Sequence, residues 1–456
     1  MPQPDALPPR TFGLPLVGNT LGIMRDPIDF QRRGHRRHGP VFSARIFGTT
    51  LTFVDPVGAP QLFEQVIRTP PDQLSLVAAY KHLVGRILEP ELFTEIDKSM
   101  REGLSVKYIG KHVAPTVAFV PQVLARRLPG DHGTLDGLRM ANDVVLHVVA
   151  HYVLGHGGAE RHADELAEAM HVLESDFSIL GMMLPIETAS ARRRRAAFDR
   201  MMGLIEAEVR ARLADRGEHD DFLQFAIDHM SSGEGAEKDD IRWLGLRVLG
   251  TIFGAHTNTA MSVASTLSDL VEHPEALARV RAEIAALPAD APMDLAAMRT
   301  LVHLHRAINE SMRLRSNGGL WRMAMCDLDL GGYKLPKGTV VGASMGLVNL
   351  DPARYDGSHE YRPARFEAMA TDNYQSPSVG STPLQFGAFG TGRNLCSGRP
   401  LAYAMLAAIL VPLLRDYEWE VVARPRRWFT LLTGGLSRPI GGLTLRYRRR
   451  VSPPRA

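Results

Sequence analysis

The sequence predicts a mostly helical fold with small β-sheets near both ends of the chain. From about residue 60 to residue 302, apolar residues recur at helical spacing, and the breaks fall at turn formers such as Pro129-Gly130. Runs rich in Val, Ile, Phe and Thr lie near the N-terminus and again after Cys326, and such runs favour strands. Because no Gly/Ser-rich or Pro-rich linker divides the chain, we expect residues 1–456 to form a single domain.

Individual elements follow from the same patterns. Residues 41–55 surround Gly48 with β-forming side chains and predict two strands joined by a tight turn. Residues 326–344 and 443–449 predict further strands. The longest helix is expected from about residue 239 to residue 272, and at 1.5 Å per residue it would be about 50 Å long, which is enough to cross a domain.

Composition and charge exclude several classes of protein. Hydrophobic residues make up 45% and charged residues 23% of the 456 residues, so the chain is neither disordered nor fibrous. A formal net charge of +3 argues against a dedicated nucleic-acid-binding protein. Two cysteines, Cys326 and Cys396, exclude a disulfide framework and a zinc site of four thiolates.

We expect a cytoplasmic protein without a membrane anchor. Three prolines lie in the first eight residues, and no charged segment followed by an apolar run marks a secretory signal there. The longest apolar helical segment carries Arg247, His256 and Asn258, which indicates a buried helix rather than a membrane span.

A glycine-rich loop that contains a cysteine carries the strongest chemical signal. Residues 386–400 read FGAFGTGRNLCSGRP, and a helical run begins near Pro400. Glycines allow the backbone to approach a flat ligand closely. A cysteine at the start of a helix is expected to have a lowered pKa, and its thiolate is a suitable axial ligand for haem iron. An isolated cysteine in a turn would more often be structural, but the spacing of Phe and Gly around Cys396 favours the ligand.

This loop resembles the haem-binding loop of the cytochrome P450 family, written FxxGx[RH]xCxG. Phe389, Gly392, Cys396 and Gly398 match, whereas Asn394 replaces the Arg or His that reaches a haem propionate. The resemblance implies the cytochrome P450 fold, in which a long central helix lies over haem b and Cys396 ligates the iron. It also implies haem contacts from the whole loop: Phe389, Gly390, Gly392, Arg393, Asn394 and Gly398. Arg393 could compensate for the charge that Asn394 lacks.

Two more segments resemble the family in order and spacing. Glu310 and Arg313 form an ExxR on a helical pattern, and Arg365 lies in a segment similar to PxRF. An i,i+3 pair taken alone is usually a surface pair. In the family these three side chains form a buried ion triad, so the resemblance implies a structural role for them.

The middle of the long helix, FGAHTNT at residues 253–259, resembles the oxygen-binding groove [AG]Gx[DE]T. Gly254 and Thr257 match, while His256 replaces the acid and Phe253 replaces the small residue. A lone Thr in a helix usually bonds to the carbonyl four residues earlier. The resemblance instead implies that Thr257 and His256 are catalytic and deliver protons, since His titrates near neutrality, and that Gly254 lies against the haem.

The resemblance also implies contacts outside the loop and the groove. Arg322, in the segment LWRMA, would bind a haem propionate through a charge-assisted hydrogen bond. Tyr80 and Lys98 fall where the sterol 14-demethylase-like branch has propionate contacts. Phe253, Trp321 and the loop around Tyr80 would shape the substrate pocket.

Two branches of the family compete. The His-Thr pair is typical of the sterol 14-demethylase-like branch, whereas an ExxR without a following proline resembles the steroid 7- and 12-hydroxylases and prostacyclin synthase. Either branch, in a soluble bacterial form, implies a haem-thiolate monooxygenase of an apolar small molecule, such as a terpenoid or polyketide-like intermediate of secondary metabolism. Coupling, desaturation or rearrangement without net oxygen insertion is the alternative. A non-catalytic haem-binding protein is a third hypothesis, which the presence of Cys396 disfavours.

The resemblance implies partners as well. Besides the substrate and O2, we expect ferredoxin and ferredoxin reductase as electron donors, because no flavin or iron–sulfur segment is visible. Arg393 and Arg399 are candidates for docking an acidic ferredoxin, although a solvated basic surface explains them equally well.

Overall fold

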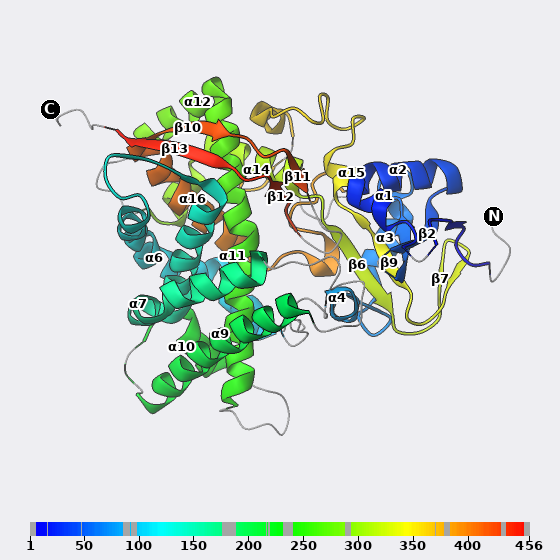
Figure 1. Cartoon of the computed structure of the whole chain (residues 1–456), viewed down its shortest axis with the longest axis horizontal. Helices are drawn as coiled ribbons and strands as arrows, with labels where there is room; N and C mark the ends of the chain where they lie inside the picture. The colour runs from blue at the N-terminus through cyan, green and yellow to red at the C-terminus, as the bar shows by residue number, and fades with distance from the viewer. Residues whose placement is uncertain are drawn as a thin grey trace.

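The computed structural model describes residues 6–15, 17–46, 48–84, 92, 98–175, 188–215, 217, 219–230, 240–287, 293–369, 371–377, 384–429 and 435–450. A large helical part and a smaller part built around an N-terminal sheet lie side by side (Figure 1). The mostly helical fold with small sheets, predicted from the sequence, is therefore confirmed.

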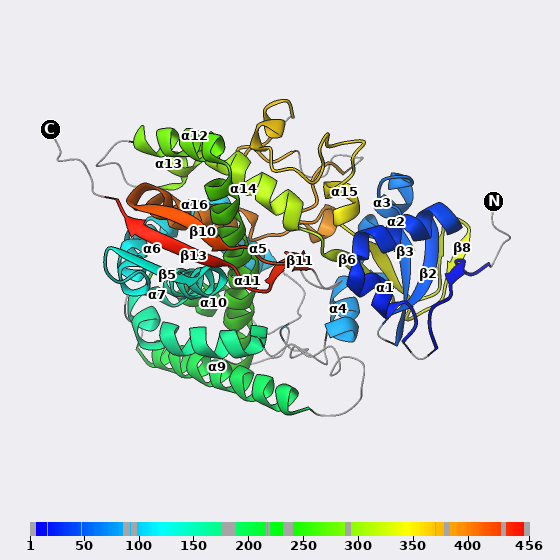
Figure 2. The ribbon, with the colours of Figure 1, turned by 45° about the horizontal axis from the view of Figure 1, so that its top comes forward.

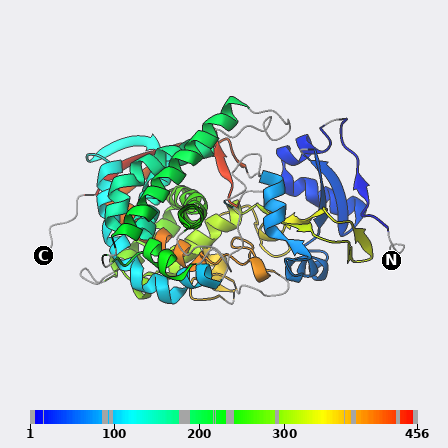
Figure 3. The ribbon, with the colours of Figure 1, turned by 90° about the horizontal axis from the view of Figure 1, so that it is seen from below.

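The helical part is organised around α11 (Ile241–Glu272), which is seen end-on at the centre of Figure 3. Asp240 caps this helix by accepting a hydrogen bond from the Trp243 N–H at 3.0 Å. Its 32 residues give a length of about 48 Å, so the predicted central helix is confirmed. The other helices of this part are α5 (Lys98–Gly103), α6 (Val106–Arg127), α7 (Gly137–Ser175), α9 (Ala189–Ala214), α10 (Phe222–His229), α12 (Pro274–Ala285), α13 (Leu295–Arg299), α14 (Val302–Arg315) and α16 (Arg399–Asp416).

Helix α7 changes direction at Gly155. Gly155 has φ 71° and ψ 178°, which few other residues adopt. Arg212 donates to the carbonyl oxygen of Leu154 at 3.2 Å and pairs with Asp221 at 2.9 Å. The bend therefore joins α7 to α9 and to the start of α10.

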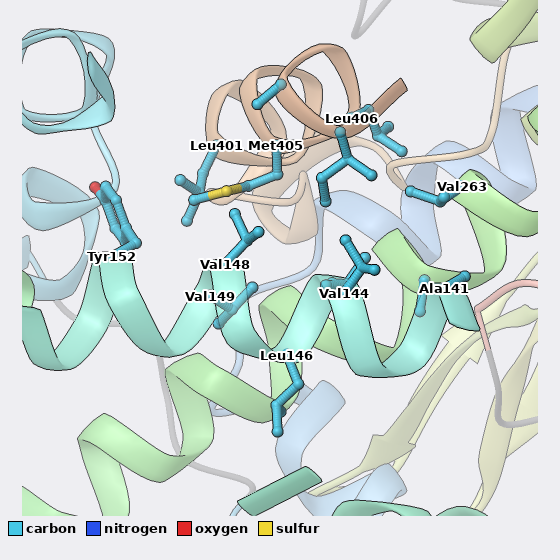
Figure 4. Close-up of a cluster of buried hydrophobic side chains, with 14 of the residues drawn as sticks. Ala141, Val144, Leu146, Val148, Val149, Tyr152, Val263, Leu401, Met405 and Leu406 are labelled. Carbon is cyan, nitrogen blue, oxygen red and sulfur yellow. The ribbon is translucent and has the colours of Figure 1, made fainter. Parts of the chain in front are cut away.

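The core of the helical part lies where α7 and α16 face α11. Figure 4 shows Val148 of α7 pointing toward Leu401 and Met405 of α16, and Val144 pointing toward Leu406 of the same helix. All five side chains are buried. Burial of such side chains is the main stabilising contribution to a fold of this kind.

The N-terminal part is a six-stranded sheet with the order β1-β2-β3-β9-β6-β4. The predicted strand pair around Gly48 is present as the antiparallel pair β2–β3. The strands are β1 (Arg10–Thr11), β2 (Val41–Ile46), β3 (Thr49–Val54), β4 (Leu74–Ser75), β6 (Gly319–Ala324) and β9 (Val340–Ser344). Near them lie α1 (Thr20–Arg25), α2 (Pro27–His38), α3 (Pro60–Arg68), α4 (Leu76–Val84) and α15 (Gly346–Asn349) (Figure 2).

Three small sheets complete the fold. The predicted C-terminal strand is β13 (Thr444–Arg449), which lies between β10 (Tyr417–Ala423) and β5 (His132–Asp136). The two hairpins are β7 (Leu328–Leu330) with β8 (Tyr333–Leu335), and β11 (Arg427–Phe429) with β12 (Arg438–Ile440). The short 3-10 helices include η2 (Pro363–Glu367) and η3 (Gly392–Asn394). Within the described ranges, no helix combines the length and the apolar character that crossing a bilayer requires.

Candidate active site

The cysteine loop folds back on itself just before α16. The Cys396 N–H donates to the carbonyl oxygen of Phe389 at 2.9 Å, and η3 lies between these two residues. Gly390 has φ 71° and Gly392 has φ 62°, in the left-handed region that disfavours a side chain. A Cβ added to Gly392 would lie 2.3 Å from Ile67 Cγ2 of α3, so the loop can approach α3 only without a side chain there.

Helix α16 begins at Arg399, three residues after Cys396, with Gly398 as its N-cap and Pro400 in its first turn. The Gly398 and Arg399 N–H groups and the Arg399 charge act to lower the pKa of Cys396, but burial acts in the opposite direction and is the largest contribution, so the pKa of this thiol is raised. The sequence-based expectation of a lowered pKa is therefore wrong for the thiol without a metal. The side chain is nevertheless exposed on one side, although protein atoms surround it on the others.

Aromatic side chains support the loop from α16. The Phe389 ring lies 5.2 Å from the Tyr403 ring, and the Tyr403 ring stacks on Tyr374 at 4.6 Å. Arg399 is ion-paired with Asp372 and lies 5.6 Å from the Tyr374 ring. Arg399 is thus paired within its own chain, and its role in docking a partner stays a prediction.

Arg393 is exposed, so it stays a candidate for docking or for contact with a propionate. Asn394 belongs to η3, and its side chain lies outside the described part of the structure.

Helix α11 packs against α16, the helix that follows this loop. Gly254 and Asn258 are four residues apart, which places them on one face, and both are exposed. A Cβ added to Gly254 would meet no atom within 4 Å. Phe253 packs against the main hydrophobic core instead of lying on that face.

These residues fit haem b. The donor is a soft thiol near the start of a helix, the loop around it carries glycines that leave its backbone uncovered, and the adjoining α11 is open at Gly254. Cys396 is the residue that would ligate the iron.

A buried polar cluster surrounds Glu174 in the last turn of α7. The Thr257 hydroxyl donates to Glu174 Oε1 at 2.9 Å, and the Asn142 side-chain amide donates to Oε2 at 3.1 Å. Nδ1 of His256 lies 3.5 Å from Oε1, and Nη2 of Arg438 lies 3.5 Å from the same oxygen. The predicted residues Thr257 and His256 therefore both contact the same oxygen of Glu174.

The hydrogens of this cluster follow from its partners. Nε2 of His256 lies 3.1 Å from the carbonyl oxygen of Asn142, and a carbonyl only accepts, so Nε2 carries a hydrogen. The contact of Nδ1 with the Glu174 carboxylate is attractive only when Nδ1 carries a hydrogen as well. Burial opposes ionisation of Glu174, but hydrogen bonds and charge from His256, Arg438 and Thr257 lower the pKa of Glu174 to about 2. The carboxylate is therefore ionised at neutral pH.

Sequence reasoning missed Glu174, Asn142 and Arg438. Glu174 lies 83 residues from Thr257 along the chain, and Arg438 is on a separate hairpin. No spacing or motif connects these segments, because their contact exists only in the folded protein.

The predicted ion triad is confirmed. Glu310 accepts from Arg313 Nε at 2.7 Å and from Arg365 Nε at 2.8 Å, and neither Glu310 nor Arg313 is exposed. Arg313 also donates to the carbonyl oxygens of Asn349 and Ser358, at 2.8 and 2.7 Å. The triad therefore joins α14 to the segment that precedes the cysteine loop.

The remaining predicted contacts lie in the N-terminal part. Arg322 is buried on β6 and donates to the carbonyl oxygens of Ile67 and Thr69 at 2.6 and 2.9 Å. The Tyr80 hydroxyl donates to the carbonyl oxygen of Gly319 at 3.1 Å, and burial raises its pKa to about 12. The Lys98 side chain is 91% exposed, with Glu102 at 3.9 Å. The haem contacts of these three residues stay predictions.

Trp321 does not shape a pocket, contrary to the prediction. It is completely buried on β6, with its ring 5.4 Å from that of Phe53 on β3. The residue belongs to the core of the N-terminal sheet, because successive residues of a strand point to opposite faces and Trp321 points into the packed one.

Comparison with known proteins agrees with this geometry. A family model described as Cytochrome P450 matches residues 118–445. Sugiol synthase from Salvia miltiorrhiza is 24% identical over 457 residues, which cover 91% of this chain and 88% of that protein. Obtusifoliol 14-alpha demethylase from Triticum aestivum is 24% identical over 461 residues, covering 97% and 98%. The retinoic acid bound cyanobacterial CYP120A1 superposes with a TM-score of 0.77 at 19% identity, covering 98% of this chain and all of that one.

Proposed function

Because the chain belongs to the cytochrome P450 family and is a monooxygenase that uses haem b, we propose that its substrate is an apolar small molecule of the terpenoid or polyketide type. The relatives carry this proposal: their names refer to sugiol and obtusifoliol, and the structural neighbour binds retinoic acid. All three molecules are largely hydrocarbon with few polar groups. On the exposed face of α11 at Gly254 and Asn258, the Asn258 side chain can form a hydrogen bond with such a polar group.

Haem b, when bound, supplies the activation of O2 and the electron transfer. Cys396 would hold it, and Gly390, Gly392 and Gly398 of the loop, together with Gly254 of α11, are the candidates for backbone contacts with it. Arg393, Asn394, Arg322, Tyr80 and Lys98 are the candidates for its propionates.

The cluster at Glu174 suggests how protons are held near the reaction. The Thr257 hydroxyl has one hydrogen, and in this geometry it points to Glu174 Oε1. Thr257 can donate toward the exposed face of α11 only when a proton reaches Glu174 Oε1 and the Thr257 hydroxyl rotates away from it. Nδ1 of His256 lies 3.5 Å from the same carboxylate oxygen, so His256 is placed to supply that proton.

The proton role is tested by Thr257→Ala. We expect this variant to consume reducing equivalents while forming at least tenfold less product per electron pair, since hydroxyl relays of this kind contribute about 10²-fold or more. An unchanged ratio of product to electrons would remove Thr257 from proton delivery.

Electrons are proposed to come from ferredoxin and ferredoxin reductase, with Arg393 as the docking cation on the loop next to Cys396. Reconstitution with this pair should support turnover that falls as salt rises. If a flavodoxin-type donor supports turnover and no ferredoxin does, the assignment fails.

The substrate class is tested by a spectral binding screen of terpenoids, sterols and polyketides, followed by turnover under labelled O2. We expect one class to bind and its product to carry one labelled oxygen atom. Product without label would instead support coupling, desaturation or rearrangement. The premise is checked by Cys396→Ser, which should abolish the red-shifted band of the reduced carbon monoxide complex.

A further inference from the structure

The β11–β12 hairpin reaches the proton-holding cluster through Arg438. Figure 1 shows this hairpin beside α14, between the helical part and the N-terminal part. Nη1 of Arg438 donates to the carbonyl oxygen of Glu174 at 2.9 Å, while its Nη2 lies 3.5 Å from Glu174 Oε1. One guanidinium therefore contacts both the backbone and the side chain of the same residue.

The backbone contact alone has an ordinary explanation. Glu174 lies in the last turn of α7, where carbonyl oxygens have no partner within the helix, and an arginine commonly satisfies them. The side-chain contact is different, because Oε1 is also the oxygen that Thr257 and His256 share. Arg438 thus competes with His256 for the atom to which Thr257 donates.

The segment around Arg438 is held firmly beside Thr257. The Leu436 N–H donates to Asn258 Oδ1 at 3.2 Å, and Asn258 directly follows Thr257. A Cβ added to Gly435 would lie 2.3 Å from Asn258 Oδ1. Ser437 donates to the carbonyl oxygen of Arg315 with its N–H at 2.8 Å and its hydroxyl at 2.9 Å. The segment is therefore fixed to α11 and α14 as well as to α7.

We propose that Arg438 is a positioning residue whose guanidinium holds the Glu174 carboxylate in place for Thr257. This inference rests on the proposed proton role of Thr257. Within the described part of the chain, the charged groups that face the Glu174 carboxylate are His256 on α11 and Arg438 on β12. The hairpin is in this way part of the proton-delivery apparatus.

The sign of the effect follows from charge. A cation within 3.5 Å of Oε1 favours the ionised carboxylate and disfavours a further proton on the pair. Its removal should therefore raise the pH at which the pair loses its proton. Arg438 is 38% exposed, so solvent screens it and the shift should be about one pH unit, at the low end for such a pair.

The experiment compares three variants of the holoenzyme. Arg438→Gln removes the charge, whereas Arg438→Lys keeps the charge but loses the two-nitrogen guanidinium that contacts both the backbone and the side chain of Glu174. Arg427→Gln is the matched control, because Arg427 lies on the same hairpin and donates to the carbonyl oxygen of Arg25 at 3.3 Å, away from the cluster.

Two measurements are made on each variant across pH. The first is the ratio of product to electrons consumed, and the second is the NMR titration of the His256 imidazole in the reduced carbon monoxide complex, assigned with His256→Asn. In Arg438→Gln, both midpoints should move up by about one pH unit. In Arg438→Lys they should move by less than half of that, and in Arg427→Gln they should not move.

The inference is overturned if Arg438→Gln behaves as Arg427→Gln does, or if its midpoints move down. The imidazole titration distinguishes a failure of the proton role of Thr257 from a failure of the role of Arg438. If Thr257→Ala leaves the product ratio unchanged but Arg438→Gln still shifts the imidazole midpoint, the proton role of Thr257 fails while the effect of Arg438 on the pair holds. If Thr257→Ala lowers the ratio and Arg438→Gln shifts neither midpoint, only the role of Arg438 fails.

Discussion

Replacement of Gly392 by Ala tests whether the cysteine loop needs a residue without a side chain at that position. Two costs are expected. The φ of 62° is left-handed, which costs an L-residue about 1–2 kcal/mol. The new Cβ would also lie 2.3 Å from Ile67 Cγ2, and overpacking of a core typically costs about 1–3 kcal/mol. The free energy of unfolding should therefore fall by about 2–5 kcal/mol.

The two costs can be separated with matched variants. Gly338 has φ 86° and no atom within 4 Å of an added Cβ, so Gly338→Ala measures the backbone cost alone. Ile67 is 3% exposed, and Ile67→Ala by itself should cost about 2–5 kcal/mol because it leaves a cavity. Since Ile67→Ala removes Cγ2, the double variant with Gly392→Ala should be more stable than the sum of the single variants by about 1–3 kcal/mol.

The assay is urea unfolding of the holoprotein, followed in parallel by circular dichroism and by the haem absorbance band. We expect Gly392→Ala to lose the red-shifted carbon monoxide band at a lower urea concentration than the ellipticity, because the strain is in the loop. The reasoning is refuted if Gly392→Ala costs no more than Gly338→Ala, or if the double variant is simply additive.

Three further predictions concern buried charge and the aromatic core. Glu310→Gln leaves two guanidinium groups facing a neutral amide, so it should destabilise the protein by about 3–5 kcal/mol by urea unfolding, whereas Glu367→Gln, which breaks the more exposed pair with Arg306, should change stability by less than 1 kcal/mol. The pKa of Glu174 is lowered from its ordinary value of 4.5 to about 2, so its ionisation stabilises the fold above about pH 4.5 and this contribution is lost as pH falls toward 2. The difference in unfolding free energy between the native protein and Glu174→Gln should therefore be about 2 kcal/mol smaller at pH 3 than at pH 7. An equal difference at the two pH values would contradict this. Trp321→Ala should lower stability by about 3–5 kcal/mol without changing which substrates bind, because Trp321 packs in the N-terminal sheet; an altered binding spectrum would restore its role in the pocket.

The parts of the fold that the sequence predicts correctly depend on local chemistry. The β2–β3 pair follows from the β-forming residues around Gly48, and α11 begins after its capping residue Asp240. The ion triad is different, since an ExxR pattern alone indicates a surface pair and only the family resemblance supplied Arg365. The errors share one cause. The raised pKa of Cys396 and the core position of Trp321 both depend on which segments pack together.

The same distinction explains why half of the site was invisible in the sequence. A metal ligand must be presented by a special backbone, so glycines mark its position within a few residues. A proton-holding cluster needs only side chains that meet, and at Glu174 they come from both ends of α7, from α11 and from β12. Any single member, such as a Glu near the end of a helix, is unremarkable alone. Substitutions in the loop should therefore act on haem binding directly, whereas substitutions in the cluster should act on pH dependence and on coupling while leaving the haem spectrum intact.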